Sequence, residues 1–270
     1  MKTRTYAARW PQPCRWIAIS SLLLCTIFLH ALPLAAQKRR ELSTHIQKTY
    51  QQMGGIYYAY SAPPTDCFAP APEGYRLVCL SHYGRHGSRW MTSDKRYEWL
   101  WQQFEDEKLL TRRGRSVRRR LKKICDNARG NGGQLSPVGV WQQQGLAARM
   151  VSRFPQMFGS DSHVTARSSV VRRCRKSMEA FVEEMKALGL GARIDMRTDS
   201  VDMQWMSHES PDEMLLKLQT DKNWTLPTHR LLASLFRHPE AIADTARLFS
   251  ELYAVASDLQ DVDLPGVSLY

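Results

Sequence analysis

One feature constrains the fold of this chain more than any other. It is a short apolar run that ends at glycines and is followed by amphipathic stretches. Residues 76–82 read Arg-Leu-Val-Cys-Leu-Ser-His, which is typical of a buried strand, and Gly84 and Gly87 follow as chain breakers. Helical patterns then occupy roughly residues 94–128 and 138–153. A buried strand followed by helices favours an α/β fold over an all-helical or all-β one.

The alternation of strand and helix returns later in the chain. Residues 163–166 predict a second short strand, and apolar residues at helical spacing predict a helix that ends near residue 188. Short extended pieces are expected near residues 193–196 and 201–205, before a helical tail from about 211 to 257. We therefore predict an α/β sheet with helical insertions.

The first 36 residues have the pattern of an export signal. Residues 1–36 contain basic residues but no acid, an apolar run at 17–29, and small residues that end at Ala36. This succession predicts a secretory signal peptide that is cleaved near Ala36, so the mature protein is expected in the periplasm or the medium. A membrane-anchoring helix is the alternative, but the run is short and Pro33 interrupts it. The residue before Cys25 is too large for a lipoprotein signal, so we expect no stable membrane anchor.

Composition places the chain among ordinary globular proteins. Of its 270 residues, 43% are hydrophobic and 24% are charged, which excludes a disordered or collagen-like chain. The formal net charge is +12, and it falls to +8 without the four basic residues of the signal. This excess favours an anionic partner: nucleic acid, acidic lipid or a small polyanion. Residues 37–200 are expected to form the N-terminal part of an α/β domain, and residues 201–270 an incomplete helical domain.

Four cysteines remain after the signal: Cys67, Cys79, Cys125 and Cys174. In an exported chain they could form two disulfides, with three possible pairings. Free buried thiols are the alternative, especially for Cys79 inside the apolar run. Because none of them forms a C-x-x-C pair, neither a zinc site nor a thioredoxin-like centre is expected.

A candidate phosphate site follows the first predicted strand. His86 lies between Arg85 and Arg89 in a glycine-containing stretch at the carboxyl end of that strand, where open α/β sheets bind ligands. Guanidinium groups clamp phosphate oxygens, and a histidine whose second ring nitrogen is held can attack phosphorus. A basic surface loop without function is the alternative.

A second basic cluster, residues 166–177, lies where the second predicted strand gives way to a helix. The first amides and cations of that helix would favour an anion at its N-terminus. We expect Arg172, Arg175 and Lys176 to lie instead on a solvated helix face.

These motifs resemble those of a known enzyme family. Residues 85–89 are similar to the Arg-His-Gly-x-Arg signature of histidine acid phosphatases, the second branch of the histidine phosphatase superfamily. Residues 167–173 resemble the second arginine motif of that family, and residues 135–139 resemble its Leu-Thr-x-x-Gly segment. Three further stretches look like bacterial exported multiple inositol polyphosphate phosphatases: residues 55–60, 81–90 and 126–130.

The resemblance implies a mechanism. His86 would be the nucleophile that forms a phosphohistidine, and Arg85, Arg89 and Arg173 would hold the transferred phosphoryl group. It implies no metal and no cofactor. It also implies an α/β domain with a largely helical second domain, and a small polyanionic substrate such as phytate or another phosphate monoester.

One departure from the family is visible. The proton donor of the family, in a His-Asp or His-Ala-Glu motif, has no counterpart, and His208-Glu209 comes too soon after Arg173 to take that place. We therefore expect the C-terminus to be truncated, or else the chain to be a degenerate paralogue. A chain without the donor would bind phosphate esters better than it hydrolyses them. The alternatives to a phytase-like enzyme are a broad acid phosphatase and a catalytically impaired phosphate-binding fragment.

Residues 112–123 form a strongly basic stretch. It fits a solvated helix, a cationic rim that attracts inositol polyphosphates, or a nucleic-acid surface. An exported chain without an aromatic-rich binding motif argues against nucleic acid, which we do not expect as a partner.

Overall fold

The computed structural model describes residues 50–63, 71–206 and 228–267. The chain divides into two compact units, Met1–Gln52 and Met53–Tyr270, and every described element except the start of η1 belongs to the second unit. The helices, short 3-10 turns (η) and strands are η1 (Tyr50–Tyr57), α2 (Asp94–Gln102), η2 (Glu107–Leu109), α3 (Arg112–Ala128), α4 (Pro137–Arg153), η3 (Pro155–Met157), β1 (His163–Ser168), α5 (Arg172–Ala187), β2 (Arg193–Thr198), α6 (Met203–Met206), α8 (His229–Leu235), η4 (Pro239–Ala241) and α9 (Thr245–Asp258).

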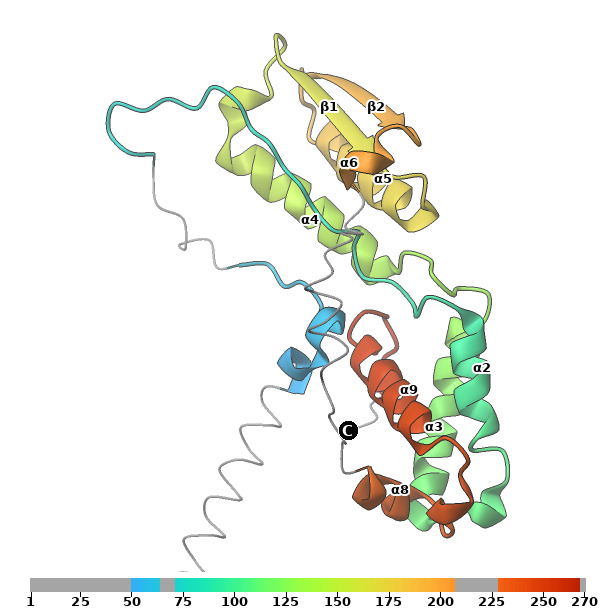
Figure 1. The fold of residues 1–270 in the computed structure, drawn as a ribbon. Coiled ribbons are helices and arrows are strands. Elements are labelled where there is room, and N and C mark those ends of the chain that lie inside the picture. Colours follow the sequence, from blue (N-terminus) through green and yellow to red (C-terminus); the bar gives the residue numbers. More distant parts are fainter. Residues whose placement is uncertain (1–49, 64–70, 207–227, 268–270) are drawn as a thin grey trace, which may run out of the picture. The chain divides into compact units, whose positions relative to one another are not determined.

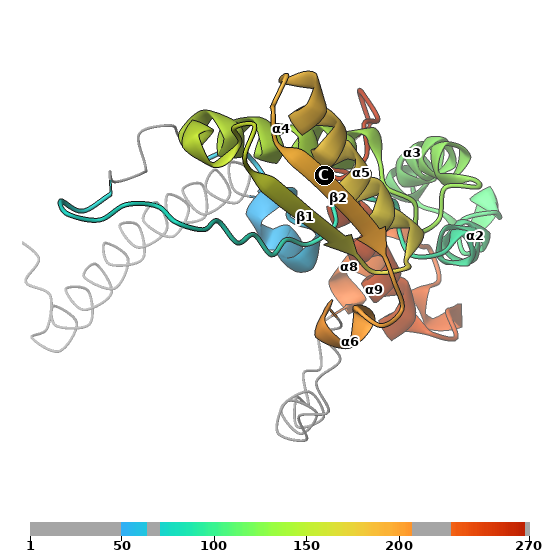
Figure 2. The same ribbon diagram turned by 90° about the horizontal axis from the view of Figure 1, so that it is seen from above.

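The sheet is a pair of parallel strands joined by a helix. β1 and β2 pair in register from His163 with Arg193 to Ser168 with Thr198, and α5 forms the crossover between them. Figure 2 shows the two strands side by side. Parallel neighbours need such a crossover because a tight turn can join only antiparallel strands. The predicted second strand, the helix after it and the extended piece near 193–196 are therefore confirmed, and so is the α/β fold class.

α4 packs along α5 beside this strand pair (Figure 1). It begins at Pro137, and the N-cap Ser136 accepts a hydrogen bond from the Gly139 amide. Proline suits this first position because its missing amide would have no partner inside the helix. Ala147 of α4, Met185 of α5 and Phe158 form the buried centre of a small core here.

A second core lies among α2, α3, α8 and α9, where large apolar side chains such as Leu100, Leu121, Leu232 and Leu248 are fully or almost fully buried. The predicted helical stretch 94–128 thus shares its core with helices beyond residue 228. The N-cap Thr111 starts α3 anew after a break, and it accepts a hydrogen bond from the Gly114 amide. The division into domains at residue 200 stays a prediction.

The predicted buried strand at residues 76–82 is wrong. The backbone is extended there, as the sequence favours, but it forms no ladder, and Val78 is 74% exposed. Leu80 packs against the α4–α5 core, and the His82 ring stacks on Phe181 of α5 with 5.7 Å between the ring centroids. A strand needs a neighbour for its backbone hydrogen bonds, and within the described residues β1 pairs with β2 instead.

The extended piece expected near residues 201–205 is also wrong. Asp199 Oδ1 accepts a hydrogen bond from the Val201 amide, and the Ser200 carbonyl accepts one from Met203. Such aspartate turns redirect the chain locally, and the short helix α6 follows. Of the predicted helical tail, residues 211–227 lie outside the described residues; α8 and α9 form the remainder, separated by η4.

The cysteines that the structure describes, Cys79, Cys125 and Cys174, are free thiols. Cys79 is exposed rather than buried, because the segment around it joins no sheet. Cys67 lies outside the described residues. Burial raises the pKa of Cys125 to about 11, so its thiol stays protonated at neutral pH.

Candidate active site

Two neighbouring glutamines of α4 hold the loop that carries His86. Gln142 Oε1 accepts a hydrogen bond from the Ser88 amide at 2.8 Å. Gln143 Nε2 donates one to the Arg85 carbonyl at 3.3 Å. Both contacts engage the backbone of the loop, so they hold its path and leave its arginine and histidine side chains available to a ligand.

α5 holds the same loop from another side. Ser177 Oγ accepts a hydrogen bond from the Gly87 amide at 3.1 Å and donates one to the Arg173 carbonyl at 2.9 Å. One hydroxyl therefore links the loop to the first turn of α5. The N-cap residue of this helix, Val171, provides no side-chain cap. Arg173 is thus placed close to His86 although 87 residues separate them in the sequence.

His86 is held in one tautomer. Its Nδ1 lies 2.8 Å from the Gly87 carbonyl oxygen. A carbonyl can only accept, so Nδ1 carries the proton and Nε2 keeps its lone pair.

The surroundings of His86 also keep the ring neutral. Burial lowers the pKa of His86 to about 4, the hydrogen bond to Gly87 opposes this change, and the positive charges of Arg173, Arg85 and Arg89 add to it. Nε2 therefore stays unprotonated down to about pH 4, which a nucleophile for acid conditions requires.

The three arginines differ in their surroundings. Arg85 is exposed, and its Nη1 donates to the Ile56 carbonyl at 3.0 Å. Arg89 is buried, and its Nη1 donates to the Trp90 carbonyl at 2.8 Å.

Two guanidinium groups of the site each have a buried nitrogen that makes no hydrogen bond to the described residues. The Nε atoms of Arg89 and Arg173 are buried and have no hydrogen-bond partner within the described residues. A buried donor without a partner costs about 1–3 kcal/mol, and an oxyanion at this position would satisfy it.

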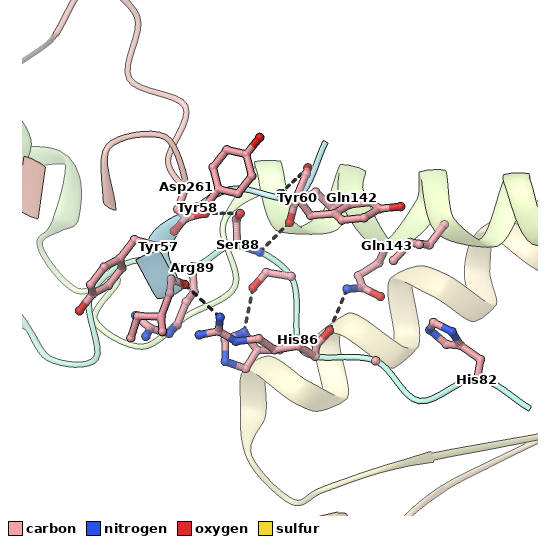
Figure 3. A pocket seen from close by; sticks show the side chains of 15 residues that line it. Tyr57, Tyr58, Tyr60, His82, His86, Ser88, Arg89, Gln142, Gln143 and Asp261 are labelled. Atoms are coloured by element: carbon pink, nitrogen blue, oxygen red, sulfur yellow. Dashed lines mark hydrogen bonds between the residues drawn. The ribbon is translucent and has the colours of Figure 1, made fainter. Parts of the chain in front are cut away.

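A cavity of about 270 Å³ opens beside His86 (Figure 3). Tyr57, Tyr58 and Tyr60 line it together with the loop and the two glutamines of α4. Asp261, from the segment after α9, contributes a carboxyl group to the lining. The cavity thus combines cations, a neutral imidazole, aromatic rings and one acid.

Three residues of this site were not identified from the sequence: Gln142, Gln143 and Asp261. A run of three glutamines, residues 142–144, just after a glycine-containing helix start was a sequence signal that could have found the first two, which are buried in α4. Nothing close to Asp261 in the sequence marks it.

Other basic residues of the sequence analysis lie elsewhere. Arg167 forms ion pairs with Asp195 at 3.3 Å and with Asp202 at 3.6 Å. Arg172, Arg175 and Lys176 are exposed, as expected for a solvated helix face. His208 and Glu209 lie outside the described residues.

The basic stretch 112–123 falls in α3, which buries Leu121 and Ile124 and exposes basic residues such as Lys122. Lys122 pairs with Asp126 at 2.9 Å within the helix. The described lining of the His86 cavity includes no residue of α3. This agrees with a solvated basic helix rather than with a rim of this cavity.

Neither a metal-ligand cluster nor a membrane-spanning helix is present among the described residues. Within 50–63, 71–206 and 228–267, no three His, Cys, Asp or Glu side chains gather as metal ligands would. The described helices include none whose length and apolar character would allow it to span a membrane.

The chain has an α/β fold, and this fold is similar to that of a solved phosphatase structure. A solved structure with this likeness is the multiple inositol polyphosphate phosphatase of Bifidobacterium longum, in complex with inositol hexasulfate. The TM-score is 0.52 and the identity 16%, over 76% of this chain and 60% of that one. At this identity the likeness concerns the fold, and this chain spans about 60% of the length of its neighbour. No protein-family model matches the sequence, and no curated protein matches it.

Proposed function

We propose that this protein is a phosphomonoesterase that transfers the phosphoryl group of its substrate first to His86 and then to water. The observation that carries the proposal is the state of His86, a neutral imidazole whose Nδ1 donates to Gly87 while three guanidinium groups surround it. A ring in this state can attack phosphorus, whereas a protonated ring cannot.

Each residue has a separate task in this reaction. Nε2 of His86 forms a bond to phosphorus as the ester P–O bond breaks, and a phosphohistidine results. Arg85, Arg89 and Arg173 balance the charge of the phosphoryl oxygens, with the two buried Nε atoms available as donors. Water then attacks the phosphohistidine, which releases phosphate and restores the imidazole.

Inositol polyphosphates such as phytate are the proposed substrates. Three observations support this class: the sequence resemblance, the fold likeness to a phosphatase that binds inositol hexasulfate, and the excess of positive charge. A broad acid phosphatase would share the chemistry, and a set of substrates with one and with several phosphate groups separates the two.

We also propose that the protein is exported and cleaved near Ala36, on the pattern of residues 1–36. Intact-mass measurement of protein recovered from the periplasm or the medium should show a chain that begins near residue 37. A membrane-inserted chain that keeps Met1 would contradict export with cleavage.

A trapping experiment tests the mechanism. The purified protein is mixed with a labelled phosphate ester, quenched without acid and mapped by peptide, and the label should lie on His86. His86→Asn should abolish the label, whereas the matched variant His82→Asn, at another histidine of the cavity lining, should keep it. Label on a serine would refute the mechanism. Phosphate binding without any label would instead favour a binding protein that does not turn over.

A further inference from the structure

We propose that Asp261 donates the proton that the leaving oxygen needs when the phosphoryl group passes to His86, an inference that rests on the phosphatase function proposed above. The tertiary structure brings a carboxyl group from a different part of the chain into the cavity of the nucleophile.

Asp261 is the one acidic residue in the described lining of this cavity, and it is 8% exposed. Figure 3 shows it next to Ser88, on the loop that carries His86. The remaining lining groups with exchangeable protons are chiefly tyrosines, arginines, glutamines and histidines. A carboxylic acid is a much stronger acid than a tyrosine, an arginine or a glutamine, and it passes its proton more readily than these to an alkoxide.

Hydrogen bonds position this carboxyl group relative to the nucleophile. Ser88 Oγ donates to Oδ1 of Asp261 at 2.5 Å, across 173 positions of sequence. The backbone of Asp261 is held as well: its carbonyl accepts from Ser136 Oγ at 2.5 Å, and its amide donates to the Asp258 carbonyl at 2.9 Å. Ser88 lies two residues after His86, so the loop that carries the nucleophile also binds the carboxyl group of Asp261.

These contacts are compatible with a protonated, neutral carboxyl group on Asp261. Ser88 donates to Oδ1, which a protonated carboxyl can accept while Oδ2 carries the proton. Oδ2 makes no hydrogen bond or ion pair with any residue in the part of the chain that the structure describes. The proton on Oδ2 is therefore not committed to another protein group of that part.

Burial of Asp261 favours its protonated form at mildly acid pH. Burial raises the pKa of Asp261 to about 6, although the bond from Ser88 and the charges of Arg89 and Arg85 lower it. The pKa of His86 is lowered, so near pH 5 the acid holds its proton while the nucleophile has none. Opposite shifts of this kind are the pattern of an acid and base pair with divided roles. Asp258, the second buried carboxyl nearby, bonds instead to the Tyr97 hydroxyl at 3.1 Å.

The step balances in atoms and charge. As the bond from His86 Nε2 to phosphorus forms and the ester bond breaks, the proton moves from Asp261 to the leaving oxygen, which departs as an alcohol. The carboxylate then takes a proton from the water that attacks the phosphohistidine. Inorganic phosphate leaves, and both groups return to their starting states.

Substrates whose leaving groups differ in basicity test the inference. p-Nitrophenolate leaves without a proton, whereas an inositol alkoxide needs one. Asp261→Asn should lower kcat for phytate by on the order of 100-fold and kcat for p-nitrophenyl phosphate by less than about 3-fold, with KM for both little changed. The matched variant Asp258→Asn should stay within about 3-fold of the unsubstituted protein on both substrates.

The pH profile of the unsubstituted protein gives a second measurement that needs no variant. Turnover of phytate should fall as pH rises through the pKa of the acid, while turnover of p-nitrophenyl phosphate should lack this fall. Equal losses on both substrates in Asp261→Asn, no loss on either, or the same basic limb for both would overturn the role of Asp261. If the unsubstituted protein hydrolyses neither ester, the proposed function fails first, and this inference fails with it.

Discussion

Gly87 and Gly139 meet so closely that neither position has room for a side chain. A Cβ on Gly87 would lie 2.4 Å from the Gly139 carbonyl oxygen, and a Cβ on Gly139 would lie 2.1 Å from the Ser88 carbonyl oxygen. Backbone oxygens cannot yield as a flexible side chain can. The loop of His86 therefore reaches the first turn of α4, and the glutamines beyond it, because both contact residues are glycines.

The first prediction concerns this contact. Gly139→Ala should lower the free energy of unfolding by about 1–3 kcal/mol and weaken phosphate binding, because the new methyl group pushes the loop away from α4. Urea unfolding and phosphate titration measure the two effects. Gly145→Ala in the same helix is the matched control, since its Cβ would meet chiefly the movable end of Arg149 and alanine favours the helix. Equal unfolding free energies and equal phosphate binding in Gly139→Ala and Gly145→Ala would contradict the close contact between Gly87 and Gly139.

A second prediction separates two neighbouring arginines. Arg173→Gln should weaken inhibition by inorganic phosphate by about 10- to 100-fold, because a hydrogen bond to a charged group contributes about 1.5–3 kcal/mol. Arg172→Gln should change it by less than about 2-fold, since Arg172 is exposed. Steady-state inhibition constants measure both. The same weakening in both variants would indicate general electrostatic attraction rather than a specific contact.

The loss of activity at low pH, the acid limb of the pH profile, should follow the protonation of His86. kcat/KM is expected to rise with pH as His86 loses its proton, with a midpoint near its pKa of about 4. Arg173 lowers this pKa, so Arg173→Gln should raise it and move the acid limb to higher pH. The profiles of the two proteins on one substrate give the shift. An unmoved limb would show that Arg173 does not act on His86.

Asp258 should make stability depend on pH. Burial and the nearby Asp261 raise the pKa of Asp258 to about 7, so between about pH 4 and 7 the folded state keeps a proton that the unfolded state has lost. The free energy of unfolding should therefore fall as pH rises through this window.

A variant checks that origin. Asp258→Asn should make the fall smaller and stabilise the protein at pH 8 by on the order of 2 kcal/mol, while Asp261, whose pKa is also raised, maintains a fall between about pH 4 and 6. Asp263→Asn is the control because Asp263 is exposed. Denaturant unfolding at pH 4.5 and pH 8 measures the difference, and a parallel fall in Asp258→Asn would assign it to other groups.

Much of the fold could be predicted because it depends on short-range pattern. Helical periodicity and the capping residues Ser136 and Thr111 act within a few residues, and the helices α4 and α5 lie close to their expected bounds. The expected strand at residues 76–82 is absent, because a strand also needs a neighbouring strand to pair with. The local sequence favours an extended backbone but does not determine that pairing.

Part of the candidate site could likewise be predicted from the sequence, and part could not. Arg85, His86 and Arg89 are close neighbours in sequence, so the pattern of cations around one imidazole is visible there. Arg167 resembled part of the second arginine motif, but two aspartates pair with it. Asp195 lies on β2, which pairs with β1, and Asp202 lies in the segment after β2, so the sequence around Arg167 contains neither partner.

The sequence by itself determined an α/β alternation, a glycine-bounded loop with a histidine between arginines, and basic residues in excess. These features depend on residues that are neighbours in the chain, where backbone preference and periodicity act. The tertiary structure decided that Asp261 lies in the cavity of His86, that Gln142 and Gln143 hold the loop, and that most of residues 76–82 stays exposed. Each of these depends on contacts between distant segments, and burial at those contacts lowers the pKa of His86 while it raises that of Asp261.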